Sequence, residues 1–305
     1  MPLQALYDLP APAKLNLFLH VVGRRDDGYH LLQSVFMLVD WADRLHFERR
    51  ADGHLARHDL GAVLPPEDLC LRAARALQSA SGCTLGADIF IDKQVPSSAG
   101  MGGGSSDAAT TLLALNRLWG LNWGRPALSA LGLTLGADLP FFLGGHNAFV
   151  QGIGEQLTPM HLPAATYAVV KPVAGITTRD IFDHPLLVRD TEPVIVTGSF
   201  DGAGFAGWPA EWGSGEGRFF GRNDLQPPAQ DRCPEVSQAA RWLQARYGNS
   251  RMTGSGSAVF ARAGMNKGTD ESPSASFPVD ELPLGWVGRM CRSLESHPLA
   301  GWAPD

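Results

Sequence analysis

Residues 96–109 read PSSAGMGGGSSDAA, and this stretch is the most informative part of the chain. Four of the five residues from Gly100 to Gly104 are glycines, which let the backbone adopt positive φ angles and approach a ligand closely. We expect Ser105 or Ser106 to cap a helix that follows directly. The unpaired N–H groups and the positive dipole end at such a helix start attract anions. The stretch therefore predicts a cradle for phosphate.

The stretch fits neither of the two best-known phosphate-binding patterns. A Walker loop needs a lysine after its second glycine, and no lysine stands between Ala99 and Asp107. A dinucleotide fingerprint that starts at Gly100 needs its third glycine where Ser105 stands. The sequence therefore supports neither a P-loop NTPase nor a Rossmann enzyme. A glycine-rich surface loop ahead of a helix is an equally good interpretation until the flanking sequence is considered.

The sequence on either side favours the phosphate cradle. Residues 87–95 alternate apolar and polar side chains, which is typical of a strand, and they lead directly into the glycines. The residues that follow carry one broad apolar face from Ala108 to Trp119 and end at Gly120, a typical helix stop. A strand, a glycine loop and a helix in this order are what a phosphate site at a helix N-terminus requires.

The N-terminal segment is predicted to be rich in β-structure. Residues 13–22 alternate, with leucines and a valine on one face and Lys14 and Asn16 together on the other. Taken alone, a solvated face is the simpler interpretation of these two polar residues, and the wall of a polar pocket is the alternative. Residues 31–38 and 43–49 predict two further strands.

Beyond about residue 160 the sequence changes in character and predicts a second domain. An insert at residues 201–217 is rich in glycine and tryptophan, and one at 264–280 is rich in glycine, serine, proline and charged residues. Both are predicted to be loops. A glycine turn at residues 254–258 leads into a strand. The remaining predicted elements are helices at 69–81, 126–133 and 236–247 and strands at 148–150 and 167–172.

The composition is that of a globular protein with a sizeable core. The chain has 305 residues, of which 44% are hydrophobic and 18% are charged. Its net charge of -6 argues against a nucleic-acid partner, because proteins that bind nucleic acids usually present a basic surface. The four cysteines lack metal-ligand spacing, and we find neither a signal peptide nor a run of about 18 apolar residues. We therefore expect a cytoplasmic protein with no membrane partner.

Two charged residues are candidates for catalysis. Asp138 stands between Gly-Ala and Leu-Pro, where a carboxylate most simply caps a helix or closes a turn. As a general base it would need a substrate hydroxyl and a nearby cation, and Lys14 is the candidate cation. Asn16, Tyr29 and His30 would add an amide, an aromatic ring and an imidazole to one concave site. Separately, Tyr29 and His30 are equally typical of ordinary loop and strand residues.

Five segments in this order give the chain a resemblance to a known family. They are residues 11–19 (APAKLNLFL), 28–30 (GYH), 96–109, 135–142 (LGADLPFF) and 251–260 (RMTGSGSAVF). With these segments the chain resembles the GHMP kinases. Because the motifs appear in family order and span most of the chain, a chance match is not a reasonable explanation.

The resemblance implies an α+β fold with two domains and a cleft between them. The expected domains are a ribosomal-S5-like, ATP-binding domain at residues 1–160 and a ferredoxin-like, substrate-side domain at residues 161–305. The implied activity is ATP-dependent phosphorylation, with Mg²⁺, of the 2-hydroxyl of a CDP-linked methylerythritol in non-mevalonate isoprenoid synthesis. Phosphoryl transfer depends mainly on positioning and charge neutralisation, which such a site supplies. We expect a small-molecule substrate, no nucleic-acid partner, and a monomer or weak homodimer.

The resemblance also implies roles for individual residues. Asp138 would take the proton from the attacking hydroxyl, and Lys14 would orient that hydroxyl and offset developing charge. The implied substrate-binding residues are Asn16, Tyr29 stacked on cytosine, His30 bonded to the edge of the base, and Thr178. The implied ATP-binding residues are Pro96, Ser97, Ser98, Ala99, Gly100, Met101, Gly102, Gly103, Gly104, Ser105 and Ser106. Family kinases hold Mg²⁺ largely through phosphates and water, and the Ser106 hydroxyl is the candidate protein ligand.

Two residues differ from the family pattern, and two alternative functions stay open. Met101 replaces the usual leucine, which conserves volume, whereas Asp68 replaces an asparagine near the expected adenine and lacks its amide donors. A mevalonate-type kinase would share the glycine loop but would hold no cytosine. A nucleotide-binding sensor without catalysis would need neither Lys14 nor Asp138.

Overall fold

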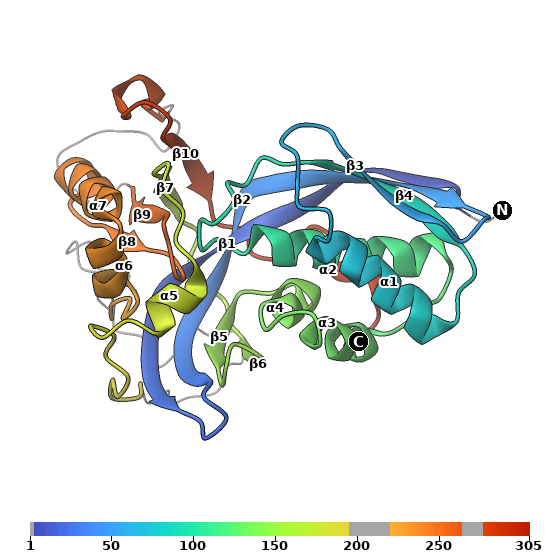
Figure 1. The fold of residues 1–305 in the computed structure, drawn as a ribbon, viewed down its shortest axis with the longest axis horizontal. Coiled ribbons are helices and arrows are strands. Elements are labelled where there is room, and N and C mark those ends of the chain that lie inside the picture. Colours follow the sequence, from blue (N-terminus) through green and yellow to red (C-terminus); the bar gives the residue numbers. More distant parts are fainter. Residues whose placement is uncertain (1–2, 195–219, 264–276) are drawn as a thin grey trace.

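The part of the chain that the structure describes folds into two β-sheets with helices packed against each of them (Figure 1). The computed structural model describes residues 3–194, 220–263 and 277–305. The predicted insert at 201–217 lies outside the described residues, as does all of the 264–280 insert except its last four residues.

Among the described residues, the first sheet has six strands and the second has four. The strands of the first sheet are β1 (Ala5–Arg24), β2 (His30–Arg50), β3 (Leu55–Asp59), β4 (Gly86–Asp92), β5 (Ala148–Gln151) and β6 (Gln156–Pro159). The strands of the second sheet are β7 (Thr166–Lys171), β8 (Arg251–Met252), β9 (Val259–Arg262) and β10 (Val287–Arg292). The α-helices are α1 (Leu69–Ser81), α2 (Gly103–Leu118), α3 (Arg125–Leu133), α4 (Leu139–Gly144), α5 (Thr178–Phe182), α6 (Gln226–Arg232) and α7 (Pro234–Tyr247). Two short 3₁₀ helices are η2 (Val279–Glu281) and η3 (Ala300–Trp302). The mixture confirms the predicted α+β class.

Strand β2 organises the first sheet. It pairs with β1 along one edge and, along the other edge, with β5 near its start and β4 near its end. Strand β3 runs parallel to β4, and β6 continues the sheet beyond β5. The second sheet is antiparallel throughout, in the order β10-β7-β9-β8.

The prediction of separate strands at 31–38 and 43–49 was wrong, because β2 is continuous. Its pairing with β1 shifts between Ala13 opposite Val39 and Pro12 opposite Ala42, so that Asp40 and Trp41 form an irregularity in the ladder. An irregularity of this kind bends a strand without ending it. It also interrupts the alternation of side chains, which is why the sequence suggested a break.

Helices α1 to α4 cover one face of the first sheet (Figure 1). Helix α2 is almost entirely buried among alanines and leucines, so it is held rigidly by packing. The expectation that Ser105 or Ser106 caps this helix was wrong. The cap is Gly102, whose positive φ of 70° suits glycine, and both serines lie inside the first turn.

A second hydrophobic cluster joins the two sheets. It combines Leu15 and Leu17 of β1 and Met101 of the glycine loop with Tyr167 and Phe260 of the second sheet. The burial of Met101 in this cluster explains how it can stand in for leucine. Strand β1 therefore contributes to the packing of both halves, and the division at residue 160 stays a prediction.

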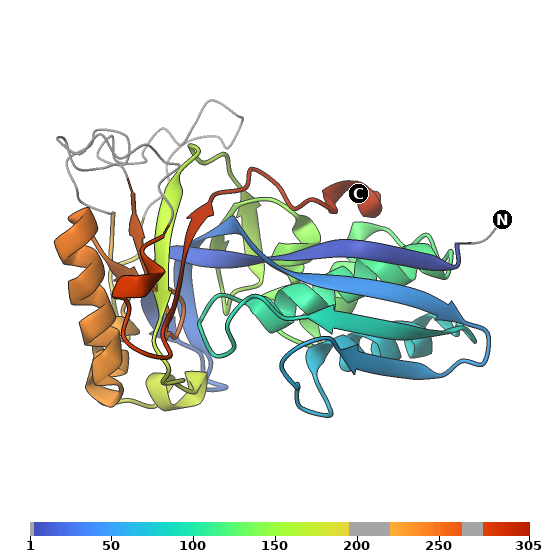
Figure 2. The same ribbon diagram turned by 90° about the horizontal axis from the view of Figure 1, so that it is seen from above.

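The C-terminal segment returns from β10 to the first half of the chain (Figure 2). Arg125 donates to the carbonyl oxygens of Leu143 and Ala300, both at 2.6 Å, and so ties the end of α4 to this segment. The backbone N–H of His297 donates to the carbonyl of Gly145 at 2.8 Å. These bonds fasten helix α4, which begins directly after Asp138.

Candidate active site

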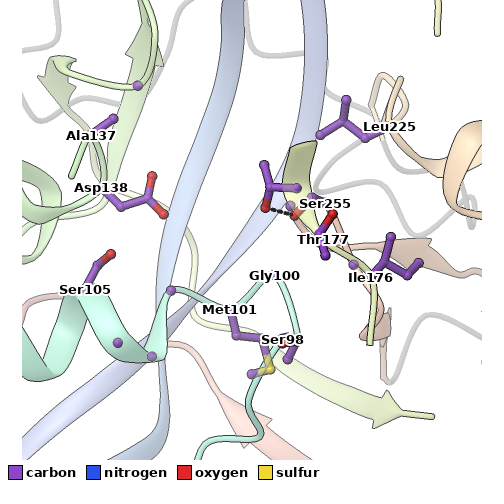
Figure 3. Close-up of a pocket in the computed structure, with 18 of the residues that line it drawn as sticks. Ser98, Gly100, Met101, Ser105, Ala137, Asp138, Ile176, Thr177, Leu225 and Ser255 are labelled. Atoms are coloured by element: carbon purple, nitrogen blue, oxygen red, sulfur yellow. Dashed lines mark hydrogen bonds between the residues drawn. The ribbon is translucent and has the colours of Figure 1, made fainter. Parts of the chain in front are cut away.

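A single large cleft brings the predicted site residues together. It encloses about 1540 Å³, which is more than the roughly 300–1,000 Å³ typical of a pocket for one ligand. Asp138 and Ser105 lie on one wall, Thr177 and Ser255 lie on the facing wall, and the glycine loop lies between them (Figure 3). The space suffices for two substrates side by side.

The glycine loop lines this cleft, and carbonyl groups of the loop are bonded to neighbouring segments. The carbonyl oxygens of Ser98 and Ala99 accept bonds from the N–H groups of Ser257 and Ala258, both at 3.1 Å. The carbonyl of Met101 accepts from the N–H of Lys14 at 2.9 Å. Because the C=O and N–H of one trans peptide point in opposite directions, the N–H groups of the same peptide units face away from these partners. The loop is thus organised as an anion-binding surface.

The start of helix α2 adds to that surface. Its first N–H groups, from Gly103 to Ser105, have no partner within the helix, and the helix dipole is positive here. All of the predicted ATP-binding residues from Pro96 to Ser105 line the cleft. Ser106 does not, because it is fully buried and its hydroxyl donates to the carbonyl of Pro12 at 2.7 Å. Ser106 is therefore unsuitable as the Mg²⁺ ligand that the sequence suggested.

Lys14 lies beside the glycine loop and is only 4% exposed. The solvated face suggested by the sequence alone was therefore wrong, and the polar pocket wall is what the structure contains. The ammonium lies 4.6 Å above the ring of Phe36 and donates to the Oδ1 of Asn16. Burial lowers the pKa of Lys14 below its ordinary value, and the negative charge of Asp138 opposes part of that shift.

Asp138 faces Lys14 across the cleft floor. Its Oδ2 atom lies 3.9 Å from the Nζ of Lys14, and its side chain is 32% exposed. Asp138 directly precedes helix α4, as a helix cap would, but its side chain makes no capping hydrogen bond. The carboxylate is held near a cation and open to the cleft, which is the arrangement that a general base requires.

Asn16 is fixed by bonds to both halves of the chain. Its side-chain amide donates to the hydroxyl of Ser34 at 3.0 Å, and its backbone N–H donates to the hydroxyl of Thr253 at 2.9 Å. Its Oδ1 atom accepts the ammonium of Lys14. Asn16 lines the cleft but is only 1% exposed, so its clearest action is to orient Lys14.

The other predicted substrate residues also line the cleft. Tyr29 is 60% exposed on the rim, where its ring is free to stack on a ligand. The ring of His30 stacks on that of Phe182, with centroids 4.9 Å apart. Thr178 lines the same region, and its hydroxyl lies 2.8 Å from that of Ser255. All four predicted substrate residues, including Asn16, therefore line one cleft.

Known proteins resemble the chain along its whole length. The sequence model described as "GHMP kinases N terminal domain" matches residues 68–146, and that described as "GHMP kinases C terminal" matches residues 211–275. A protein of Methylibium petroleiphilum named 4-diphosphocytidyl-2-C-methyl-D-erythritol kinase is 63% identical over 99% of this chain and 100% of its own. The chain belongs to the GHMP kinase family.

Further relatives of this GHMP kinase agree in sequence and in fold. A protein of Paracidovorax citrulli with the same name is 55% identical over 99% of both chains. A crystal structure of 4-(cytidine 5'-diphospho)-2C-methyl-D-erythritol kinase is 33% identical, with a TM-score of 0.74 over 93% of this chain and 98% of the other. Homoserine kinase from Cytophaga hutchinsonii shares the fold alone, at 16% identity and a TM-score of 0.61 over 96% of both chains. The predicted GHMP kinase fold is therefore confirmed.

Asp68 of this GHMP kinase has a defined structural role. Its carboxylate accepts from the N–H of Leu71 at 3.0 Å and so caps helix α1. Arg57 lies 3.1 Å from the same oxygen and supplies a compensating positive charge. Asp68 lines the cleft together with Leu64 and Leu69. The negative charge of Asp68 is therefore balanced by Arg57.

Several residues of the site were not predicted from the sequence. Lys93 lines the cleft, and its ammonium is held between the buried carboxylates of Asp43 and Asp107. Phe182 and Arg189 contact His30, although they follow it by more than 150 residues. No local pattern could have indicated these contacts, because they depend on how α5 returns to the start of β2.

Gly100 provides a test of how closely the two halves approach one another. A Cβ atom there would lie 2.2 Å from the carbonyl oxygen of Thr253, and the φ of +72° is unfavourable for any other residue. We expect Gly100→Ala to lower the free energy of unfolding by about 2–5 kcal/mol, measured by denaturant titration. Gly120→Ala is the matched control, since its φ is +68° but no atom lies within 4 Å. Equal losses in the two variants would show that backbone strain alone accounts for the effect.

Proposed function

We propose that this GHMP kinase transfers the γ-phosphate of ATP to the 2-hydroxyl of 4-diphosphocytidyl-2-C-methyl-D-erythritol, a step of non-mevalonate isoprenoid synthesis. The observation that carries the proposal is the pairing of Lys14 and Asp138 beside the glycine loop, in a cleft that Tyr29 and His30 also line. The likeness to relatives of that name over their whole length supports the choice of substrate.

The proposed mechanism needs only positioning and proton transfer from this chain. The N–H groups of the glycine loop and of the α2 start bind the triphosphate. The carboxylate of Asp138 accepts the proton of the attacking hydroxyl, and the ammonium of Lys14 orients that hydroxyl and stabilises the charge that develops on it. Asn16 holds Lys14 in place through its Oδ1 atom.

We propose Mg²⁺ as the metal that accompanies ATP. In the described residues no group of three or more His, Cys, Asp or Glu side chains could hold a metal by itself. The side chain of Ser105 points into the cleft near the glycine loop (Figure 3), so its hydroxyl oxygen would hold the ion together with phosphate oxygens and water. Bound Mg²⁺ would neutralise phosphate charge.

The assay that tests the function measures ADP release from ATP with a panel of alcohols. We expect turnover with the CDP-linked methylerythritol and none with homoserine or mevalonate phosphate. Turnover with one of those alcohols in its place would show that the substrate assignment is wrong. ATP that binds without transfer to any alcohol would instead support the nucleotide-binding sensor.

Tyr29 tests the recognition of cytosine. Its ring lies exposed on the rim, and one base stacked on one aromatic ring contributes about 1–3 kcal/mol. We expect Tyr29→Ala to raise the KM for the CDP substrate about 10-fold or more and to leave the KM for ATP unchanged, whereas Tyr29→Phe should keep the wild-type value. Tyr7, which is 57% exposed and does not line the cleft, supplies the control variant Tyr7→Ala. A normal KM in Tyr29→Ala would contradict stacking.

Cellular location and assembly remain predictions. No helix among the described residues has the length and apolar character needed to cross a bilayer. We propose that the enzyme acts in the cytoplasm as a monomer or weak homodimer, without a nucleic-acid or membrane partner. Sedimentation at micromolar concentration measures the assembly state.

A further inference from the structure

Arg189 makes an unusual contact with a residue of the proposed substrate site. Its Nε atom donates to the Nε2 atom of His30 at 3.2 Å. Its other nitrogens donate to the carbonyl oxygens of Phe182, His184 and Leu187 at 2.8–3.1 Å. The guanidinium is therefore fixed from four sides, and its position relative to the imidazole is defined.

The contact determines which nitrogen of His30 carries the proton. An arginine Nε is always protonated and has no lone pair to offer, so the Nε2 atom of His30 must be the acceptor. A neutral imidazole with an unprotonated Nε2 carries its proton on Nδ1. Burial lowers the pKa of His30, the charges of Arg189 and Arg24 lower it further, and Asp183 opposes them, which agrees with a neutral ring.

The Nδ1–H group is then a donor available to a ligand. His30 lines the cleft, and its Nδ1 atom has no hydrogen-bond partner among residues 3–194, 220–263 and 277–305. Cytosine offers two neighbouring acceptors, N3 and O2, on its pairing edge, whereas N3 of uracil carries a proton. An imidazole fixed as a donor therefore fits cytosine and opposes the N3–H of uracil.

We propose that Arg189 is a positioning residue that selects cytosine over uracil by holding His30 in the Nδ1–H tautomer. The inference rests on the proposed function, because it places the base of the substrate beside His30. Arg189 itself does not line the cleft. Arg189 affects specificity indirectly, because it sets which ring nitrogen of His30 carries the proton. Hydrogen-bond partners of metal-ligating and catalytic histidines set the tautomer of those residues in the same way.

A double-mutant cycle distinguishes control of the His30 tautomer by Arg189 from structural stabilisation of residues 182–187 by the same side chain. The probes are CDP and UDP, and the measurement is the dissociation constant by calorimetry. In His30→Asn the side-chain amide supplies a donor whose protonation does not depend on Arg189. In the wild-type background we expect Arg189→Met to weaken the binding of CDP about 10-fold and to reduce the preference for CDP over UDP. In the His30→Asn background the same substitution should weaken the binding of CDP less than about 3-fold. Equal losses in the two backgrounds would overturn the proposal.

A spectroscopic measurement tests the tautomer without any ligand. Long-range ¹H–¹⁵N correlation spectra distinguish a protonated from an unprotonated ring nitrogen of His30. We expect the Nδ1–H form in the wild-type protein and its loss in Arg189→Met. An Nε2–H form in the wild-type protein would overturn the inference. Failure of the wild-type protein to bind CDP would contradict the proposed function instead, and the spectra would still decide the role of Arg189.

Discussion

Asp138→Asn lowers kcat by about 10²-fold or more while leaving the affinity for ATP nearly unchanged; this is the result that we expect for loss of a general base. The amide has almost the same size as the carboxylate but cannot accept the proton of the substrate hydroxyl. ATP affinity should persist because the glycine loop and the α2 start do not depend on this side chain for their geometry. Steady-state kinetics and calorimetry with ATP supply the two measurements.

The control for Asp138 is an aspartate that lies outside the cleft lining. Asp180 lies on α5, is exposed and does not line the cleft, so Asp180→Asn should keep wild-type kcat. Because the Asp138 side chain makes no capping hydrogen bond, its replacement should also leave the thermal unfolding temperature nearly unchanged. A kcat close to wild type in Asp138→Asn would refute the role of proton acceptor.

Lys14→Met should cost a factor of about 10²–10³ in kcat, the usual loss when one donor to a developing negative charge is removed. Methionine fills a similar volume, so the effect reports on charge and not on a cavity. We also expect stability to change by no more than about 1–2 kcal/mol, because burial already disfavours the charged lysine in the folded state. Kinetics and denaturant unfolding measure the two effects.

The pH profile adds a second readout for Lys14. The charged form is the one proposed to act, so kcat should fall as pH rises through the pKa of Lys14. Burial places that pKa below the ordinary value of 10.5, and the fall should therefore begin at lower pH than for an exposed lysine. In Lys14→Met this part of the profile should disappear.

Lys171 provides a matched control for a buried lysine. It is 5% exposed, its pKa is also lowered by burial, and it does not line the cleft. Its ammonium donates to the carbonyl oxygens of Pro172 and Ala174 at 2.6 and 3.0 Å. Lys171→Met should therefore reduce stability with little change in kcat. A large loss of kcat in both lysine variants would indicate a general effect of removing buried charge.

The sequence predicted the parts of the site that depend on local pattern. The glycine loop and the helix that follows it could be predicted because glycines and helix periodicity are local signals. The burial of Lys14 could not be predicted from alternation, since a solvated and a buried polar face have the same period of two. The combination of this face with Tyr29 and His30, and then the resemblance, indicated that it lines a cleft.

The remaining contacts depend on tertiary structure. Thr253 bonds to Asn16 across 237 residues, and Arg189 reaches His30 across 159. The start of α2 at Gly103 was missed because serine is the commoner cap, whereas here glycine supplies a positive φ. The bend at Asp40 in β2 likewise follows from its pairing with β1 and not from its own sequence.

The bonds between Arg125, His297 and the end of α4 have a consequence for the order in which the protein is made. A ribosome produces the helix that presents Asp138 long before it produces residues 297–304, which fasten that helix. Thr253 and Gly254, which pack against Gly100, are likewise synthesised long after it. In the nascent chain, the glycine loop and the proposed base Asp138 therefore lack the residues that pack against them in the folded protein. The site is completed only when β10 and residues 297–304 have left the ribosome.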